Sequence, residues 1–261
     1  MRQAPAYVPG HQLLAGKSVL ITAAAGAGIG YSAAKRCAEE GCRALMISDI
    51  HPRRLEEAVE RLKAETGLQA VYGQLCNVVN EEEVQTLVAT AEQLLGGVDV
   101  LINNAGLGGQ KRVTEMTDEE WLRVIDVTLT GTFRMTRAML PHMERRGTGA
   151  IVNNASVLGW RAQKEQAHYA AAKAGVMALT RCSAVEAAES GVRINAVAPS
   201  IALHDFLKKA SSQELLEQLA SREAFGRAAE VWEVANVMVF LASDYASYMV
   251  GEVLSVSSQQ A

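Results

Sequence analysis

Short apolar segments alternate with longer helical segments along nearly the whole chain, and this order constrains the fold most strongly. The apolar segments are short enough for strands, and the segments between them place apolar residues at helical spacing, as Ile29, Ala33 and Cys37 do. A strand, a helix and another strand in succession favour a right-handed crossover and a parallel sheet. The expected strands are 17–22, 43–49, 69–76, 98–106, 149–156, 192–199 and 251–257, and the expected helices are 28–41, 51–67, 80–97, 117–146, 167–191 and 230–243.

This alternation predicts an α/β fold. We expect a single-domain Rossmann-type, doubly wound parallel sheet of about seven strands, with helices on both faces. Residues 1–15 are expected to form an N-terminal arm and residues 16–261 one domain, with an irregular, partly helical insertion at about residues 200–226. Open sheets of this kind bind ligands beyond the carboxyl ends of their strands, so functional residues are expected there.

The composition argues against several classes of partner. The net charge of −4 gives no reason to expect nucleic acid or an anionic membrane, and no apolar run approaches the roughly 18 residues of a membrane span. Residues 1–16 lack the apolar core of a signal peptide. Cys37, Cys42, Cys76 and Cys182 are scattered, which favours reduced structural thiols over a metal or redox site. We therefore expect a cytoplasmic protein without a metal ion.

A glycine-rich stretch joins the first expected strand to the first expected helix. It reads "ITAAAGAGIG" over residues 21–30 and contains Gly26, Gly28 and Gly30. Small residues let the backbone approach a pyrophosphate, and a helix N-terminus supplies N–H groups and positive potential. The stretch does not match the strict G-x-G-x-x-G pattern. On its own it fits either a nucleotide cradle or an ordinary tight turn.

Asp49 ends the second expected strand, where a carboxylate can bond the ribose of an adenosine. The same carboxylate would repel a 2′-phosphate, which favours NAD over NADP. His51, Arg53 and Arg54 follow closely and weigh against that preference, unless they are simply the solvated start of a helix.

The pentapeptide "YAAAK" places Tyr169 and Lys173 on one face of a helix. An ammonium group near a phenol favours the tyrosinate, so Lys173 is expected to lower the pKa of Tyr169. Ser156 stands at the end of the expected strand 149–156, where its hydroxyl can hold a substrate oxygen beside the phenol.

Several motifs together resemble the short-chain dehydrogenase/reductase family: the loop from Thr22 to Gly30, "NNAG" at residues 103–106, Ser156, "YAAAK", and "GVRINAVAPS" at residues 191–200. The resemblance runs from about residue 16 to about residue 256 and implies that residues 16–261 form a single dinucleotide-binding and catalytic domain. It implies hydride transfer between a nicotinamide cofactor and a secondary alcohol or ketone. Tyr169 would be the general acid/base, Lys173 would bond the nicotinamide ribose, and Ser156 would polarise the substrate.

The same resemblance implies a site for NAD, with NADP less favoured. Asn104, Ala105 and Gly106 would pack beneath the cofactor, and Ile201 would meet the nicotinamide carboxamide through its backbone. The implied cofactor-binding residues are Thr22, Gly26, Gly28, Ile29, Gly30, Asp49, Asn77, Val78, Asn104, Ala105, Gly106, Tyr169, Lys173, Pro199 and Ile201.

The sequence departs from the family pattern in four places. The glycine loop is one residue longer than usual, with Ala23 in place of a glycine, and the path of its backbone is left open. Asn77 stands where an aspartate is usual, and Ser200 replaces a glycine in the segment "APSIALHDF". Thr128 takes the place of an active-site asparagine that helps to hold a water leading to the lysine, so we count Thr128 among the catalytic residues.

The residues expected around the substrate are mostly apolar, which favours an alicyclic or acyl substrate over a sugar. The chain is similar to 3-oxoacyl-thioester reductases, and also to an actinobacterial group for steroid-ring degradation that would act on a hydroxy-hydrindane-propanoyl-CoA. Basic residues such as Lys111 either meet the phosphates of CoA or are ordinary surface charges. His204 either contacts the ligands or is exposed. The candidate substrate residues are Leu107, Val157, Leu158, Trp160, Gln166, His204 and Phe206.

Two alternatives remain at this point. One is a 3-oxoacyl-ACP or 3-oxoacyl-CoA reductase. The other is a non-catalytic NAD-binding regulator, which Thr128 favours and the intact set of Ser156, Tyr169 and Lys173 disfavours. The expected helices 117–146 and 167–191 carry apolar residues beyond one core stripe, and the resemblance implies that they pair between subunits in a homotetramer or homodimer.

Overall fold

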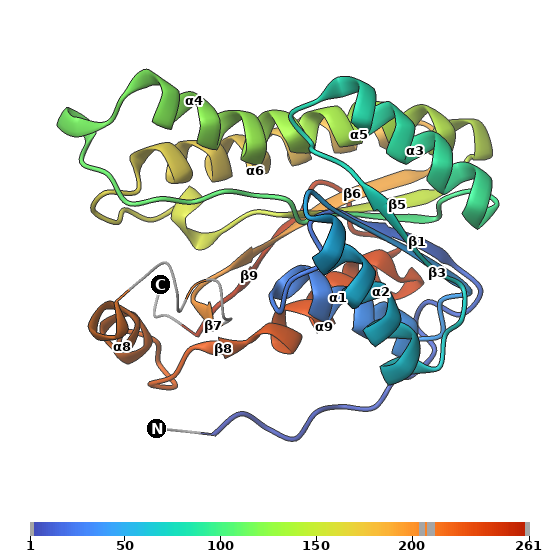
Figure 1. The fold of residues 1–261 in the computed structure, drawn as a ribbon, viewed down its shortest axis with the longest axis horizontal. Helices are drawn as coiled ribbons and strands as arrows, with labels where there is room; N and C mark the ends of the chain where they lie inside the picture. The colour runs from blue at the N-terminus through green and yellow to red at the C-terminus, as the bar shows by residue number, and fades with distance from the viewer. Residues whose placement is uncertain (1–2, 204–206, 208–211, 259–261) are drawn as a thin grey trace.

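The protein is described by a computed structural model, which covers residues 3–203, 207 and 212–258. Seven parallel strands form one twisted sheet in the order β3-β2-β1-β4-β5-β6-β9, as predicted (Figure 1). Buried side chains fill both faces of the central strands, as expected when helices cover both sides of a parallel sheet. The strands are β1 (Ser18–Ile21), β2 (Ala44–Asp49), β3 (Val71–Leu75), β4 (Val100–Asn103), β5 (Gly149–Asn154), β6 (Val192–Pro199) and β9 (Val253–Val256).

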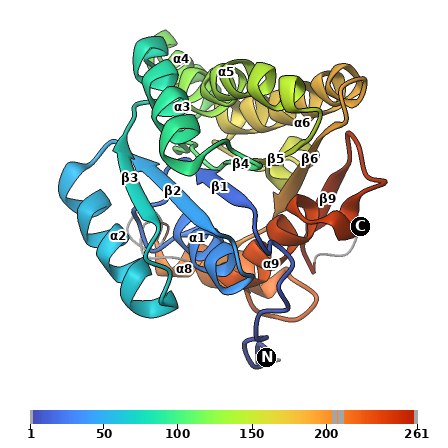
Figure 2. The same cartoon turned by 90° about the vertical axis from the view of Figure 1, so that its right-hand side faces the viewer.

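Helices cover the sheet in two layers. Figures 1 and 2 show α3, α4, α5 and α6 on one face, and α1, α2 and α9 on the other. The helices are α1 (Ile29–Glu39), α2 (Pro52–Thr66), α3 (Glu81–Leu95), α4 (Asp118–Ile125), α5 (Gly131–Arg146), α6 (Ala167–Ala188), α8 (Gln213–Ser221) and α9 (Val231–Ala242). Short 3₁₀ turns lie at η1 (Val113–Glu115), η3 (Val157–Gly159) and η4 (Asp244–Ala246).

Local sequence signals set the ends of several helices. Pro52 occupies the first turn of α2, and Gly67 ends that helix in the left-handed conformation with φ of 75°. At the start of α4 the Thr117 hydroxyl accepts from the Glu120 N–H, and the Glu120 carboxylate accepts from the Thr117 N–H. This reciprocal capping box confirms the helix start expected from the sequence.

The predicted helix 117–146 is continuous but contains a π-helical turn, η2 (Asp126–Thr130), between α4 and α5. The sequence gives no sign of this turn. π-Turns in helices are frequent at functional sites, and this one carries Thr128, which is fully buried. It places Thr128 beside the segment that follows β4.

The order of the strands reverses at β1, which lies between β2 and β4. The chain runs from β1 outward to β3, and then returns to the other side of β1 to form β4. Crossovers on either side of such a switch point leave a crevice at the carboxyl ends of the strands. The residues that follow β1, β2, β4 and β5 therefore share one edge of the sheet.

The insertion between β6 and α9 carries α8 and is closed at its base by a small second sheet. There β7 (Ala202–Leu203) pairs with β8 (Ala229–Glu230) in parallel. This pairing was not predicted, because two-residue strands leave no periodic pattern in a sequence.

The N-terminal arm, residues 3–15, lies against the end of α1. The Glu40 carboxylate accepts from the backbone N–H groups of His11 at 2.7 Å and Leu13 at 3.0 Å. Glu40 also pairs with Arg36, and both side chains are almost fully buried. A buried ion pair that is also hydrogen-bonded on its remaining side holds the arm to the domain.

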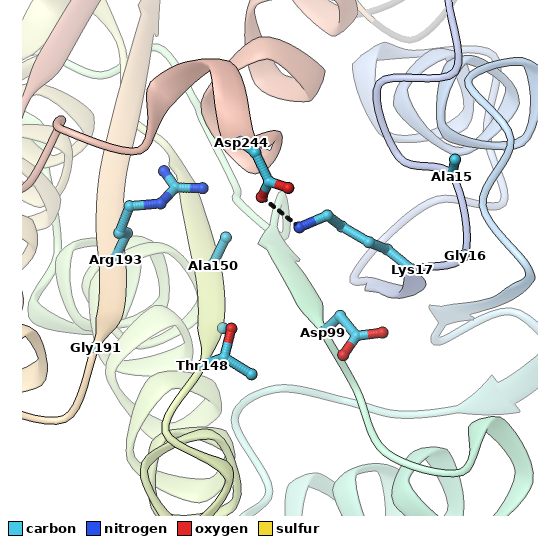
Figure 3. Close-up of a pocket in the computed structure, with 10 residues that line it drawn as sticks. Ala15, Gly16, Lys17, Asp99, Thr148, Ala150, Gly191, Arg193 and Asp244 are labelled. Carbon is cyan, nitrogen blue, oxygen red and sulfur yellow. Dashed lines mark hydrogen bonds and ion pairs between the residues drawn. The ribbon is translucent and has the colours of Figure 1, made fainter.

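A cavity of about 270 Å³ lies at the opposite, amino-terminal edge of the sheet (Figure 3). Its charged side chains already have partners: Lys17 pairs with Asp244 at 2.7 Å, and Arg193 donates to backbone carbonyls at the end of α9. Asp99 accepts from the backbone N–H of Ser18 at 2.8 Å. These groups tie strand starts together and leave no free charge for a ligand, so we look for the functional site at the other edge.

Candidate active site

Ser156 and Tyr169 face each other across the carboxyl end of β5. The Ser156 hydroxyl lies close enough to the phenol to oppose the rise in its pKa, and Ser156 Oγ accepts from the Leu158 N–H at 3.2 Å. Ser156 caps the short turn η3, which fixes its side chain. A fixed serine hydroxyl beside a phenol is suited to hold an oxygen that gains or loses a proton.

Lys173 lies one turn after Tyr169 on α6, and its side chain is only 3% exposed. Its ammonium donates to the backbone carbonyl of Asn154 and lies 5.6 Å from the centre of the Tyr169 ring. Burial lowers the pKa of Lys173 to about 8, because desolvation disfavours the charged form. The structure thus brings together Ser156, Tyr169 and Lys173, as the sequence predicted.

The pKa of Tyr169 departs from the expectation. We expected Lys173 to lower it, but burial raises the pKa of the phenol, and only the hydrogen bond from Ser156 opposes that change. Lys173 is not among the groups that shift this pKa. In this structure Tyr169 is therefore a neutral phenol that can donate a proton.

Thr128 supports the segment after β4. Its hydroxyl accepts from the Leu107 N–H at 2.9 Å and donates to the Leu107 carbonyl at 3.1 Å. A β-carbon on the neighbouring Gly108 would lie 3.6 Å from the Tyr169 ring. Thr128 therefore fixes the backbone that runs past the phenol.

The glycine loop folds over the end of β2. Ala23 adopts the left-handed conformation with φ of 52°, and the Ala24 N–H donates to the Ser48 carbonyl at 3.0 Å. Ala24 and Ala25 are buried. The Ala24 bond continues the pairing of β1 with β2 beyond Ile21, so the loop begins against the end of β2.

The donors at the start of α1 fit a phosphate group. Gly28 is the N-cap of α1, and no side chain caps the N–H groups of the first turn. A β-carbon on Gly30 would lie 2.4 Å from Asn104 Nδ2 and 2.6 Å from the Ala23 carbonyl, whereas one on Gly26 would meet nothing closer than 3.9 Å. Gly30 thus lets the helix approach β4, and Gly26 keeps the surface of the loop open.

Asp49 lies beside this loop at the end of β2. Its carboxylate is 8% exposed and accepts from the Ala25 N–H at 3.4 Å and the His51 N–H at 3.1 Å. Arg54 lies 3.4 Å away. Burial is the main cause that raises the pKa of Asp49, and Arg54 and the backbone donors partly oppose it.

The remaining cofactor candidates lie at the same edge of the sheet, and several of them already make contacts within the protein. Thr22 Oγ1 accepts from the N–H groups of Asn104 and Ala105, both at 3.0 Å. The side chain of Val78 is buried against α5 and faces the core. The carbonyl of Ile201 already accepts from the Ala229 N–H at 2.9 Å. Asn77 follows β3, Gly106 follows β4, and Pro199 ends β6.

The substrate candidates differ in how far their side chains are exposed. Leu158 and Trp160 follow Ser156, and Trp160 is 51% exposed, whereas Val157 is buried. Gln166 is buried, and its amide donates to the Gly109 carbonyl at 2.8 Å, so it holds the loop after β4 in place. His204 and Phe206 lie outside the described residues.

A cavity of about 180 Å³ is lined by Gly108, the residue that also passes close to the Tyr169 ring. Leu107 and Val124 form apolar parts of its wall, and Lys111 and Arg123 contribute two positive charges. Glu120 offsets one of them through an ion pair with Lys111 at 3.4 Å. His168 also lines this cavity and is 3% exposed.

Asn154 was missed by the sequence reasoning. It touches both Lys173 and Asn104. The signal was present as a doubled asparagine at the end of two strands, in "NNAG" and "NNAS", but only the first pair was connected with the cofactor.

The comparisons with known proteins agree with this geometry. A family model described as "Enoyl-(Acyl carrier protein) reductase" matches residues 23–258. A crystal structure of a short chain dehydrogenase from Mycobacterium smegmatis superposes with a TM-score of 0.88 at 56% identity, covering 99% of each chain. The chain belongs to the short-chain dehydrogenase/reductase family. Proteins of this family use a nicotinamide cofactor.

Two curated relatives indicate the chemistry of similar proteins. The "(5R,7aS)-5-hydroxy-7a-methyl-1-oxo-2,3,5,6,7,7a-hexahydro-1H-indene-carboxyl-CoA reductase" of Mycobacterium tuberculosis is 59% identical over 98% of this chain and 97% of its own length. A "3-oxoacyl-[acyl-carrier-protein] reductase" of Staphylococcus aureus is 37% identical over 92% and 96%, respectively. This short-chain dehydrogenase/reductase is therefore a nicotinamide-dependent oxidoreductase that acts on alcohol or ketone groups, as the sequence predicted.

Two absences hold for the part of the chain that the structure describes. No helix there is long and apolar enough to cross a membrane. Within the same residues, no group of three or more His, Cys, Asp or Glu side chains is arranged to hold a metal ion.

Proposed function

We propose that this enzyme is an NAD(H)-dependent dehydrogenase or ketoreductase whose substrate is a hydrophobic alicyclic alcohol or ketone carried as a CoA thioester. The observation that carries the proposal is the Tyr169 phenol beside the Ser156 hydroxyl, with Lys173 buried one turn away. The bound nicotinamide supplies or accepts the hydride. The roles of the protein residues below belong to the same proposal.

Tyr169 exchanges the proton. Burial keeps its phenol neutral, which is the form that donates a proton to a carbonyl oxygen during reduction. Ser156 holds that oxygen through its hydroxyl, which the Leu158 N–H keeps in place. Lys173, held by the Asn154 carbonyl, bonds the nicotinamide ribose and thereby places the cofactor beside the phenol. In the oxidative direction the same residues act in reverse.

The preference for NAD rests on Asp49. A 2′-phosphate at the end of β2 would meet a carboxylate that is almost fully buried and only partly balanced by Arg54. Like charges brought together at low solvent exposure repel strongly. The ribose hydroxyls of NAD instead offer donors to the same oxygens.

The CoA thioester is supported by the surface beside the phenol. The cavity lined by Gly108 has apolar walls at Leu107 and Val124, and Lys111 and Arg123 at its rim. The phosphates of CoA suit the rim charges, and the reacting ring lies on the Tyr169 side of Gly108. The relative from M. tuberculosis is named for a bicyclic CoA thioester, which agrees with a CoA-bearing substrate.

Absorbance of the nicotinamide cofactor tests this function. The purified enzyme is mixed with NADH or NADPH and, in turn, a hydrindanone-CoA thioester, a 3-oxoacyl-CoA and the corresponding free acids. We expect turnover of the bicyclic thioester with NADH, weaker turnover of the 3-oxoacyl-CoA, and the least with free acids. A higher rate with the 3-oxoacyl-CoA would favour the alternative reductase. No turnover with either cofactor would favour a non-catalytic regulator.

A charge reversal separates recognition of CoA from recognition of the ring. Arg123→Glu should raise KM for the CoA thioester at least about tenfold, the effect of 1.4 kcal/mol, and leave KM for an N-acetylcysteamine thioester nearly unchanged. The control is Arg145→Glu at the far end of α5, which makes the same change in net charge. Equal KM changes in both variants would show that Arg123 makes no specific contact with CoA.

We also propose a homodimer or homotetramer. Phe133 on α5 is 40% exposed, and Val185 on α6 is 70% exposed. Exposed apolar side chains on neighbouring helices are suited to burial against a second copy. Light scattering should give a mass of two or four chains, and a monomer at micromolar concentration would contradict this. The buried free thiols of Cys37, Cys42 and Cys76 are suited to a reducing compartment such as the cytoplasm.

A further inference from the structure

Two adjacent asparagines end β4, and two more end β5. The strands are parallel and in register, with Asn103 opposite Asn153. Successive side chains of a strand point to opposite faces of the sheet, so Asn103 and Asn153 lie on one face and Asn104 and Asn154 on the other. The two pairs have different partners.

The first pair is part of the core. Asn103 Nδ2 donates to Asn153 Oδ1 at 2.9 Å and to Thr136 Oγ1 at 3.2 Å. Asn153 Nδ2 donates to Thr180 Oγ1 at 2.9 Å. These bonds connect the sheet to α5 and α6, and all the residues involved are buried. Their effect is on stability.

The second pair reaches the glycine loop. Asn154 Nδ2 donates to Asn104 Oδ1 at 3.0 Å. Asn104 Nδ2 then donates to the carbonyls of Thr22 at 3.2 Å and Ala23 at 3.0 Å. A side-chain amide has its acceptor and its donors on opposite sides. The bond from Asn154 therefore orients the Asn104 amide so that its N–H groups face the loop.

Asn154 also contacts the lysine of the site. Its backbone carbonyl accepts from the Lys173 ammonium. One residue thus joins Lys173 to the loop that begins at Thr22, with Asn104 as the intermediate. The side chain serves the loop and the backbone serves the lysine, so a substitution at this position separates the two contacts.

Asn154 Oδ1 is buried and has no hydrogen-bond partner among the described residues, and the same is true of Asn103 Oδ1 in the core pair. A buried carbonyl without a partner costs about 1–3 kcal/mol, so neither amide is explained by that atom. Asn154 differs from the core pair in the partner of its donor, which is Asn104, whose own N–H groups face the glycine loop.

We propose that Asn154 is a positioning residue that orients the Asn104 amide towards the glycine loop, and thereby couples the conformation of that loop to the site of Lys173. The inference rests on the proposed function, in which the loop holds the dinucleotide and Lys173 serves the reaction. Asn154 acts on cofactor affinity through Asn104, and it need not touch the cofactor.

The test replaces the donor of Asn154 by an acceptor. In Asn154→Asp the new carboxylate cannot donate to Asn104 Oδ1, and Asn104 can satisfy it only by turning its N–H groups away from Thr22 and Ala23. The dissociation constant for NADH is measured by fluorescence without substrate, and the melting temperature without cofactor. We expect the NADH dissociation constant to rise at least about tenfold, an effect of 1.4 kcal/mol.

The control disturbs the core pair instead. Thr180→Val removes the acceptor of Asn153 and keeps the shape of the side chain. It should lower the melting temperature and leave the NADH dissociation constant within about twofold of the wild type, a change of less than 0.5 kcal/mol. If Asn154→Asp does not fold, Asn154→Ala takes its place, because it also deprives Asn104 Oδ1 of its donor.

A double-mutant cycle gives the sharpest outcome. Asn154→Ala should weaken NADH binding strongly in the wild-type background and hardly at all in the Asn104→Ala background, since Asn154 acts through Asn104. Equal effects in both backgrounds, or wild-type affinity in Asn154→Asp, would overturn the inference while the wild type still binds NADH. If the wild type binds neither NADH nor NADPH, the proposed function and this inference both fail.

Discussion

The Thr128 hydroxyl makes two hydrogen bonds with the backbone of Leu107. It accepts from the Leu107 N–H at 2.9 Å and donates to the Leu107 carbonyl at 3.1 Å. A hydroxyl can do both because it has one donor and two acceptor positions. With threonine in place of the usual asparagine, the segment after β4 is therefore supported.

Thr128→Val keeps the shape of the side chain and removes both bonds. Leaving the backbone groups of Leu107 unpaired should reduce the free energy of unfolding by about 1–3 kcal/mol, measured by urea denaturation. We expect kcat to fall more than KM rises, because the supported backbone runs past the Tyr169 ring. Thr128→Ser retains the hydroxyl and is the control. Equal stability and kcat in the two variants would contradict this role.

Gly30 and Gly26 should respond differently to the same added methyl group. In Gly30→Ala the β-carbon would collide with Asn104 Nδ2 and the Ala23 carbonyl, whereas in Gly26→Ala it meets no atom closer than 3.9 Å. Without cofactor, Gly30→Ala should lose about 1–3 kcal/mol of stability from overpacking, and Gly26→Ala should melt like the wild type. If the loop holds the pyrophosphate, Gly26→Ala should still weaken NADH binding. A stable Gly30→Ala would show that the loop relaxes freely.

Asp49→Asn should change the choice of cofactor. The amide keeps an acceptor for the Ala25 N–H but removes the charge that opposes a 2′-phosphate. The ratio of kcat/KM for NADH to that for NADPH should fall at least about tenfold, or 1.4 kcal/mol. Glu57→Gln, which removes an exposed carboxylate paired with Arg53 on α2, should leave the ratio unchanged. An unchanged ratio in Asp49→Asn would place the selectivity elsewhere.

Because Lys173 is buried, the free energy of unfolding should rise with pH in the range where this lysine loses its proton. Its pKa of about 8 lies below that of the unfolded chain, so between pH 8 and about 10.4 the unfolded state binds more protons than the folded state. The penalty for burying the charge is present in full below pH 8, and stability rises with pH across this window. Over that range the free energy of unfolding of the wild type should rise by up to about 3 kcal/mol relative to that of Lys173→Met. Parallel stability curves for the two proteins would contradict the lowered pKa.

The parts of the fold that follow from periodicity could be predicted from the sequence. The crossover order and the caps at Thr117 and Gly67 rest on local patterns, and the structure contains all of them. The β7–β8 pair could not be predicted, because two-residue strands have no period. The π-turn at Thr128 arises from packing against the segment after β4, which lies far away in the sequence.

The identity of the site residues could be predicted where a sequence motif contains them. Their pKa values could not, because the surrounding structure sets them. The spacing of "YAAAK" placed Tyr169 and Lys173 together, but burial reversed the expected direction of the phenol's pKa. Spacing carries no information on desolvation. Asn154 escaped attention because its importance lies in hydrogen bonds to two residues that are distant in the sequence.

The central claim is that the Tyr169 hydroxyl exchanges the proton, and Tyr169→Phe tests it most directly. We predict that kcat/KM for the ketone falls about 10²–10⁴-fold, while the NADH dissociation constant, measured without substrate, stays within about threefold of the wild type, or 0.7 kcal/mol. Tyr245→Phe, which alters a phenol that is 77% exposed, should keep full activity. Full activity in Tyr169→Phe would contradict the mechanism.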